Sequence, residues 1–265
     1  MGYGWLALPR EWVESFGEIA RFGARVLRDV WGGRVVRFFG EALRQAGILI
    51  LSSTLVITGL VFIIGLQCGI EGAYLLRAQG TPAYAGLFSA WCDLRELVPY
   101  AFGYMMAAKV GTGIVAELGS MRISDEIDAL EVMSVPSFVY LVCTRVIAAV
   151  LSIIPLYLFS LYASFFATEL VTTRFFGLSP GVYQHYFRLY LPSIDIVYSL
   201  IKAMVFAVAV SLIHCYYGYY AKGGPAGVGV AVGRAIRLSI VTVVILNLLL
   251  SLLFWGGGNT VRVAG

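Results

Sequence analysis

The feature that most restricts the fold is a run of twenty-one residues, 46–66, that contains no charged side chain. A helix of this length crosses a hydrocarbon core about 30 Å thick. Four more apolar segments follow, at 97–116, 146–168, 196–217 and 238–255. Apolar residues make up 60% of the chain and charged residues only 13%, which excludes an ordinary soluble domain. We therefore predict an all-α membrane protein in which residues 46–265 form a domain of five transmembrane helices.

Residues 1–45 precede this domain as a separate helical segment. Between residues 12 and 30, one helical face is apolar and aromatic, and the other carries Arg21, Arg25 and Arg28. A helix of this kind lies in a membrane surface rather than across it. A soluble helical hairpin is the alternative, but it would leave many aromatic side chains without a core. We predict an interfacial amphipathic helix that ends at Trp31, where two glycines follow.

Five spans would divide the basic residues unequally between the two sides of the membrane. Thirteen fall on the side of the N-terminus and five on the other, with Lys202 left uncounted inside a span. The positive-inside rule then places the N-terminus in the cytoplasm and the C-terminus outside. We expect a multi-pass protein of the inner (plasma) membrane, with the segment between the second and third spans on the cytoplasmic side. Residues 67–96, which include Arg95 and Glu96, are expected to form an exposed outer connection with a turn at Gly80–Thr81–Pro82. Ser179 and Pro180 are expected to begin a helix on the same side.

That cytoplasmic segment holds the one acidic cluster between long apolar runs. Ser124 is a favourable N-cap, and acidic residues follow where the positive end of a helix favours carboxylates. Apolar residues recur at helical spacing until Pro136. We predict a helix over about 124–134 that docks a soluble partner through Glu117, Ser124, Asp125, Glu126, Ile127, Asp128, Leu130, Glu131 and Met133. A solvated helix that only closes the turn is the alternative.

Two lysines lie inside predicted spans, where a charge is costly and usually faces a protein interior, a cavity or a partner. Lys109 lies about two turns before Glu117, so the two could interact indirectly, or Lys109 could reach the cytoplasmic surface. Lys202 lies two turns after Asp195. It could form a charge relation along its own helix, or it could contact a lipid headgroup or a neighbouring helix.

Enzymatic chemistry has no support in the sequence. There is no GxxxxGK[ST] loop for nucleotide phosphates, no CxxC pair, and no metal-ligand spacing around His185 or His214, where we expect an interfacial, hydrogen-bonded histidine at 214. We interpret the glycine-rich stretch 223–229 as a tight cytoplasmic turn. Cys68 and Cys92 both fall on the predicted outer side, so sidedness permits a disulfide between them. We predict no enzyme activity, no metal, no cofactor and no nucleic acid for this chain itself.

Several motifs resemble the MlaE/YrbE permease family, over roughly residues 97–247. They are Lys109–Val110–Gly111–Thr112–Gly113, Ala116–Glu117–Leu118–Gly119, Met121–Arg122, Ile127–Asp128–Ala129–Leu130–Glu131–Val132–Met133, Asp195 with Lys202 and Phe206, and the run from Gly223 to Gly229. The similarity is closest to the B-type YrbE subunits of actinobacterial Mce systems. One departure is Ser134, where the family commonly has glycine, so the exit from the 124–134 helix is expected to differ.

The resemblance implies the permease half of an ABC lipid transporter. In that family the acidic segment is the coupling helix that inserts into a separate ATPase dimer, which binds ATP and Mg. The implied partners are that ATPase, a second permease of the A type in a heterodimer, and MCE-domain proteins on the outer face. Lipids or other hydrophobic molecules are the implied cargo. Two alternatives stay open: an ion-coupled secondary transporter, and a structural membrane anchor for an outer lipid-transfer assembly.

A lipid site is expected toward the outer side, at the ends of the first, second and fifth spans. An acyl chain with a headgroup needs apolar walls with a few polar groups. Depth in the membrane, together with the position of the family's pocket, selects Leu60, Ile64, Gln67, Tyr100, Tyr104 and Leu249.

Overall fold

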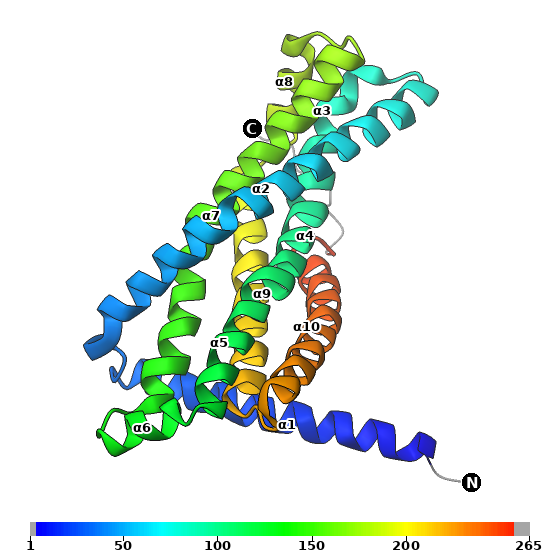
Figure 1. Cartoon of the computed structure of the whole chain (residues 1–265). Helices are drawn as coiled ribbons and strands as arrows, with labels where there is room; N and C mark the ends of the chain where they lie inside the picture. The colour runs from blue at the N-terminus through cyan, green and yellow to red at the C-terminus, as the bar shows by residue number, and fades with distance from the viewer. Residues whose placement is uncertain (1–3, 257–265) are drawn as a thin grey trace.

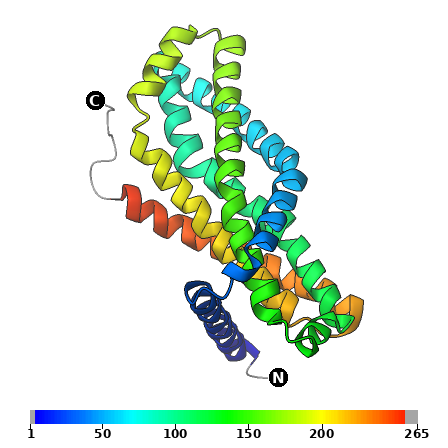
Figure 2. The same ribbon diagram turned by 90° about the vertical axis from the view of Figure 1, so that its left-hand side faces the viewer.

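The computed structural model describes residues 4–256, with side chains from residue 17 onward, and contains no strand in that range. The predicted C-terminal tail outside the membrane lies beyond the described residues. The molecule is an elongated helical bundle (Figure 1). Both views place α1 (Gly4–Trp31) across one end of the bundle, at the same end as the short helix α6 (Glu126–Val132). The two views are related by a 90° turn, and Figure 2 shows α1 from a second side.

The amphipathic pattern of α1 determines how it packs. Phe22 and Val26 are buried against α9 and the segment before α7, while Arg21, Arg25 and Arg28 are exposed. The helix ends at Trp31, and Gly33 then takes a positive φ of 72°. The prediction of an amphipathic helix ending at this point is therefore confirmed for the residues with described side chains.

Four helical regions are long and apolar enough to cross a membrane: 36–78, 138–175, 193–219 and 224–255. They contain α2 (Phe39–Ala78), α7 (Thr144–Leu170), α9 (Ser193–Tyr219) and α10 (Gly224–Trp255). Each includes one of the predicted spans at 46–66, 146–168, 196–217 and 238–255. These four predictions are confirmed as helices, and the chain is a multi-pass membrane protein.

The remaining predicted span, 97–116, is helical throughout but consists of consecutive short segments. They are α3 (Ala85–Phe88), a π-helix (Ser89–Leu97), α4 (Val98–Met105), a second π-helix (Met106–Gly111) and α5 (Thr112–Ile123). Residues at the junctions keep right-handed helical angles, so the segments follow one another as a single rod. None reaches the length of a span by itself, and the total of five spans stays a prediction.

The prediction of an exposed connection over 67–96 is wrong. Helix α2 continues for forty residues to Ala78, about 60 Å at 1.5 Å per residue. It packs along α7, where a side chain on Gly65 would come within 2.5 Å of the Ser164 backbone. Only the turn at Gly80–Thr81–Pro82 is as predicted, with a φ of 72° at Gly80 and a 3-10 turn (Pro82–Tyr84) after it. The charges of Glu71 and Arg77 lie on the exposed side of this helix, which explains why the sequence suggested a loop.

The glycine-rich stretch is also not a turn over its whole length. Only Gly223 and Gly224 have positive φ values, 90° and 67°, and α10 begins at Gly224 with Pro225 in its first turn. Proline is favoured there because the first helical residues have no intrahelical partner for their N–H groups. Residues 225–229 are therefore helical, and the turn is shorter than expected.

A ladder of small residues at 103, 107 and 111 packs inside this chain. A Cβ on Gly103 would lie 2.9 Å from Val243 on α10 and 3.1 Å from Phe206 on α9. Ala107 is fully buried, and Gly111 faces His214 of α9. These residues bring the α4–α5 rod close to α9 and α10.

Outside the long helices, α8 (Pro180–Leu189) begins at the predicted Ser179 and Pro180 and lies at the end of the molecule opposite α6 (Figure 1). Tyr183, 1% exposed, anchors it against α3, and burial raises the pKa of the Tyr183 phenol.

Candidate functional site: the α6 surface and the buried charge network

The predicted docking helix exists as α6, but its start differs from the prediction. Ser124 is the C-cap of the preceding helix α5 rather than the N-cap of α6, and its hydroxyl donates to the Ser120 carbonyl at 2.8 Å. It also donates to Glu126 at 3.0 Å. The N-cap is Asp125, in the left-handed region with φ of 59°. A tight left-handed turn separates α5 from α6, and a local N-cap signal could not distinguish it from a normal helix start.

Three contacts hold α6 against the bundle. Ile127 is fully buried in the main hydrophobic core. Asp128 forms an ion pair with Arg122, with 2.7 Å between Oδ1 and Nη1. Glu131 accepts a hydrogen bond from Ser137 at 2.6 Å, and the Ser137 hydroxyl lies 3.0 Å from the phenol of Tyr219. These hydrogen bonds connect α6 to the end of α9, so a displacement of α6 would also move that end.

The outer surface of α6 is acidic with an apolar end. Asp125, Glu126, Asp128 and Glu131 are exposed. Val132 and Met133 follow them and are 86% and 64% exposed. The predicted apolar face of Ile127, Leu130 and Met133 is thus only partly right: the first two face the core, and Met133 faces outward. Ile127 is buried and therefore not available to a partner. Val132, which lies outside the predicted docking set, is exposed and available.

Glu117 lies apart from this surface. Its carboxylate pairs with Arg145 of α7 at 2.6 Å, and the Arg145 side chain is 6% exposed. Arg145 also donates to the Leu141 carbonyl at 2.9 Å. Lys109 is exposed on the rod. Glu117 therefore joins α5 to α7 instead of belonging to the outer face of α6.

A network of buried charges centred on Lys202 lies where the N-terminal part of α9 meets the end of α10. Its side chain has no solvent exposure, and its ammonium donates to the Arg95 carbonyl at 2.7 Å and to Ser251 at 2.8 Å. It pairs with Glu96 at 3.4 Å. Of the alternatives for Lys202, contact with neighbouring helices is the one observed.

Asp195 has different partners. Its carboxylate pairs with the Arg95 guanidinium at 2.7 Å, and the Trp255 indole N–H donates to it at 3.2 Å. Glu96 accepts from Asn247 at 3.0 Å and from Ser251 at 2.7 Å. Asp195 and Lys202 therefore share one helix but bond to separate partners.

Two cations and two carboxylates in this network join the π-helix 89–97, α9 and α10. Buried charges are tolerated in a bundle when they are paired and hydrogen-bonded. The glutamate is the accessible member, with a side chain 46% exposed. The sequence indicates Lys202 and Asp195 as unusual intramembrane charges. It predicts Arg95 and Glu96 in the exposed connection instead, because they stand in a charged stretch before the second apolar segment.

A second buried polar group, Asp93, lies two residues before Arg95. Asp93, fully buried, accepts hydrogen bonds from Ser89 at 3.2 Å and Thr168 at 2.7 Å. A disulfide joins Cys68 of α2 to Cys92, with their Cα atoms 6.8 Å apart. The pairing that sidedness permitted is therefore present. Cys143 and Cys215 are buried free thiols.

The six residues selected for a lipid site lie on three helices, α2, α4 and α10. Tyr104 donates a hydrogen bond to Tyr100, and their ring centroids are 4.5 Å apart. Leu60, Gln67 and Leu249 are exposed on α2 and α10, and Ile64 is half-buried. Their role in lipid binding stays a prediction.

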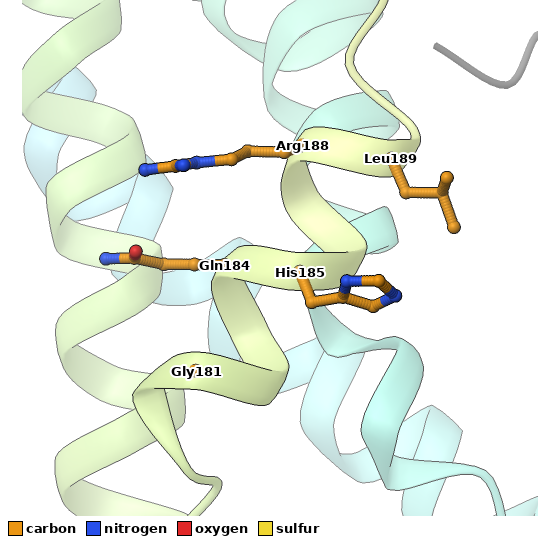
Figure 3. A pocket seen from close by; sticks show the side chains of 5 residues that line it. All are labelled: Gly181, Gln184, His185, Arg188 and Leu189. Atoms are coloured by element: carbon orange, nitrogen blue, oxygen red, sulfur yellow. The ribbon is translucent and has the colours of Figure 1, made fainter. Parts of the chain in front are cut away.

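The two histidines occupy different environments. His214 is hydrogen-bonded, as expected, and it is fully buried within the bundle: Nδ1 lies 2.9 Å from the Val210 carbonyl. His185 lies at a pocket of about 440 Å³ on α8 (Figure 3). There Gln184 and Arg188 point to one side of the helix, and His185 and Leu189 point to the other.

These features define a helical membrane protein with a buried charge network between its helices and an exposed acidic helix at one end. The sequence matches the family model "Permease MlaE" over residues 42–253. The chain belongs to the MlaE permease family.

Curated relatives support this assignment. A probable ABC transporter permease protein of Rickettsia bellii is 37% identical over 161 residues, which are 61% of this chain and 62% of the relative. TRIGALACTOSYLDIACYLGLYCEROL 1 of Arabidopsis thaliana, a chloroplastic protein, is 30% identical over 220 residues, 83% of this chain and 61% of that protein. The intermembrane phospholipid transport system permease protein MlaE of Haemophilus influenzae is 26% identical over 254 residues, 95% and 97% of the two chains. The match thus spans about three fifths of the Rickettsia relative.

Proposed function

We propose that this chain is the permease subunit of an ABC transporter that moves phospholipids or related hydrophobic molecules across the cell envelope. The observation that carries the proposal is the family match over residues 42–253, together with relatives whose names specify ABC permeases and phospholipid transport. ATP and Mg would bind in a separate ATPase subunit.

Helix α6 would be the contact with that ATPase. Its exposed carboxylates would supply charge complementarity, and Val132 and Met133 would supply the apolar anchor that interfaces place at their centre. The buried Ile127 and the hydrogen bonds from Glu131 through Ser137 to Tyr219 would pass a movement of α6 to α9. A nucleotide-driven switch needs two states that the partner distinguishes, and the docked helix provides the contact.

The complete transporter would contain two permeases, because an ABC machine has two ATPase sites and this chain has one α6. We place the N-terminus in the cytoplasm on the distribution of basic residues. The resemblance to B-type YrbE subunits favours an A-type partner and MCE-domain proteins outside. Lipid would bind toward the outer side, near Tyr100, Tyr104, Leu60, Ile64, Gln67 and Leu249.

The test is ATPase co-purification with a double variant of α6, Val132→Asp with Met133→Asp. Both side chains are exposed, so the fold should persist while ATPase recovery falls at least tenfold, because charges would enter the centre of the contact. Val36→Asp is the matched control, since Val36 is also an exposed apolar residue, 75% accessible, but lies outside α6. Unchanged recovery with the double variant would contradict docking through this surface.

Ion-coupled transport is the second candidate, favoured by the charge network around Lys202. Reconstitution separates the two functions. Lipid movement that requires the ATPase and ATP supports the ABC proposal, and transport driven by an ion gradient without ATPase supports the alternative. Loss of an outer assembly alone, with no transport in either case, would indicate an anchor.

A further inference from the structure

A pocket of about 680 Å³ lies between α1 and the last turns of α9, at the end of the molecule that carries α6 (Figure 1). Its floor is aromatic. The ring of Phe22, which is 5% exposed, lies 5.6 Å from that of Tyr216 and 6.0 Å from that of Tyr220, between centroids. Tyr220 itself is 48% exposed. The pocket therefore combines an apolar floor with access from outside the bundle.

The rim of this pocket is positively charged. Arg21 and Arg25 come from α1, and Lys222 comes from the loop after α9. All three are exposed, and none forms an ion pair with any residue whose side chain the structure describes. Glu18 is the one acidic residue of the lining, and its carboxylate accepts a hydrogen bond from the Tyr216 hydroxyl. The lining carries three cations and one anion.

Two of the three cations have contacts that orient them. The Arg25 guanidinium lies 4.0 Å from the centre of the Phe138 ring, in a cation–π contact. Arg21 donates from Nε to the Gly17 carbonyl at 3.3 Å, which leaves its terminal nitrogens for other acceptors. Charges held this way converge on one cavity, whereas the exposed Arg28 and Arg37 do not line it.

We propose that this pocket binds the phosphate headgroup of an anionic phospholipid from the adjacent membrane leaflet. Arginine and lysine supply the donors that phosphate oxygens need, and the aromatic floor suits the glycerol and the first acyl carbons. An amphipathic helix with basic residues on its polar face lies at the depth of the headgroups. The bound lipid would join α1 to α9. The site lies at the last turns of α9 and is separate from the charge network around Lys202, which lies at the N-terminal part of α9. The proposal does not depend on transport.

Native mass spectrometry of the full chain, released from nanodiscs containing phosphatidylglycerol and phosphatidylcholine, tests the proposal. The wild-type chain should retain phosphatidylglycerol in preference to phosphatidylcholine. Arg21→Gln with Lys222→Gln should weaken phosphatidylglycerol binding roughly thirtyfold, because each variant removes one direct hydrogen-bonded contact with the phosphate, and each such contact contributes a factor of about five. Arg25 is left unchanged because it packs on Phe138.

Arg28→Gln with Arg37→Gln is the matched control, since it removes the same charge from exposed positions outside the pocket and should leave retention unchanged. Equal losses in the two double variants would overturn the proposal, because they would indicate general surface attraction. No preference of the wild type for phosphatidylglycerol would also overturn it, whether or not the variants fold. Inorganic phosphate that binds the lipid-free chain as tightly as phosphatidylglycerol would assign the pocket to soluble phosphate instead of lipid.

Discussion

At the scale of single residues, Ser134 explains how α6 ends. Its N–H donates to Glu131 at 3.0 Å, and the next N–H, that of Val135, donates to Leu130 at 3.0 Å. This is a Schellman ending, which places Ser134 in the left-handed region with φ of 59°. Glycine is favoured at such a position because a Cβ is strained there. The departure from the family's glycine at Ser134 therefore leaves the turn in place but with local strain.

Ser134→Gly should stabilise the chain by about 1 kcal/mol, because it removes the cost of a left-handed non-glycine residue. Thermal unfolding of the detergent-solubilised protein measures the change. Ser120→Gly in the middle of α5 is the opposite control and should destabilise by about 0.5–1 kcal/mol. An unfolding temperature that drops in both variants would show that Ser134 makes a contact that its backbone angle does not reveal.

Gly111 is required by a close approach. A Cβ at this position would lie 2.5 Å from the His214 Nε2, and the His214 ring is fully buried. Gly111→Ala should destabilise by about 1–3 kcal/mol, the usual range for overpacking a core. Gly113→Ala, two residues along the same helix, has no atom within 4 Å of the new Cβ and should be tolerated. Thermal unfolding measures the loss. If adding His214→Ala to Gly111→Ala restores part of the stability, the clash with the His214 ring causes the loss; if it restores none, the strain has another source.

At the scale of elements, the charge network joins three helical segments. Lys202→Met would remove the donor to the buried Arg95 carbonyl and to Ser251, and the cation beside Glu96, which should cost about 1–3 kcal/mol. Adding Glu96→Gln should restore part of the loss, because the unpaired charge is then gone. Thermal unfolding of Lys202→Met, of Glu96→Gln and of the double variant measures the coupling free energy between the two residues.

Lys109→Met is the control for this experiment, because Lys109 is the other lysine of a predicted span but is exposed. Its removal should change stability by less than about 0.5 kcal/mol. If the two lysine variants behave alike, the network around Lys202 does not hold α9 to its neighbours.

At the scale of the whole molecule, the proposed function would make this chain half of the unit that an ABC transporter needs. We expect a heterodimer with a non-identical A-type permease. Native mass spectrometry of the chain expressed alone and with such a partner should show a stable complex of the two different chains. A homodimer that binds the ATPase and moves lipid without a second permease would contradict the expectation.

The sequence by itself determined the membrane class, four of the helices, the amphipathic face of α1 and the existence of a short acidic helix near 124–134. These features depend on hydropathy and helical periodicity, which are local properties of the chain. It also indicated Lys202 and Asp195, because charges are rare inside apolar runs.

Only the tertiary structure decided the rest. The extension of α2 to Ala78, the π-helical segments, and the Cys68–Cys92 disulfide depend on which helices touch. The partners of Lys202 lie about a hundred residues earlier, at Arg95 and Glu96, and about fifty later, at Ser251. Spacing along one helix can place two charges on the same face, but it cannot identify the neighbouring helix that pairs with them. The packing of α9 against the α4–α5 rod and α10 determines which residues pair with Lys202 and Asp195.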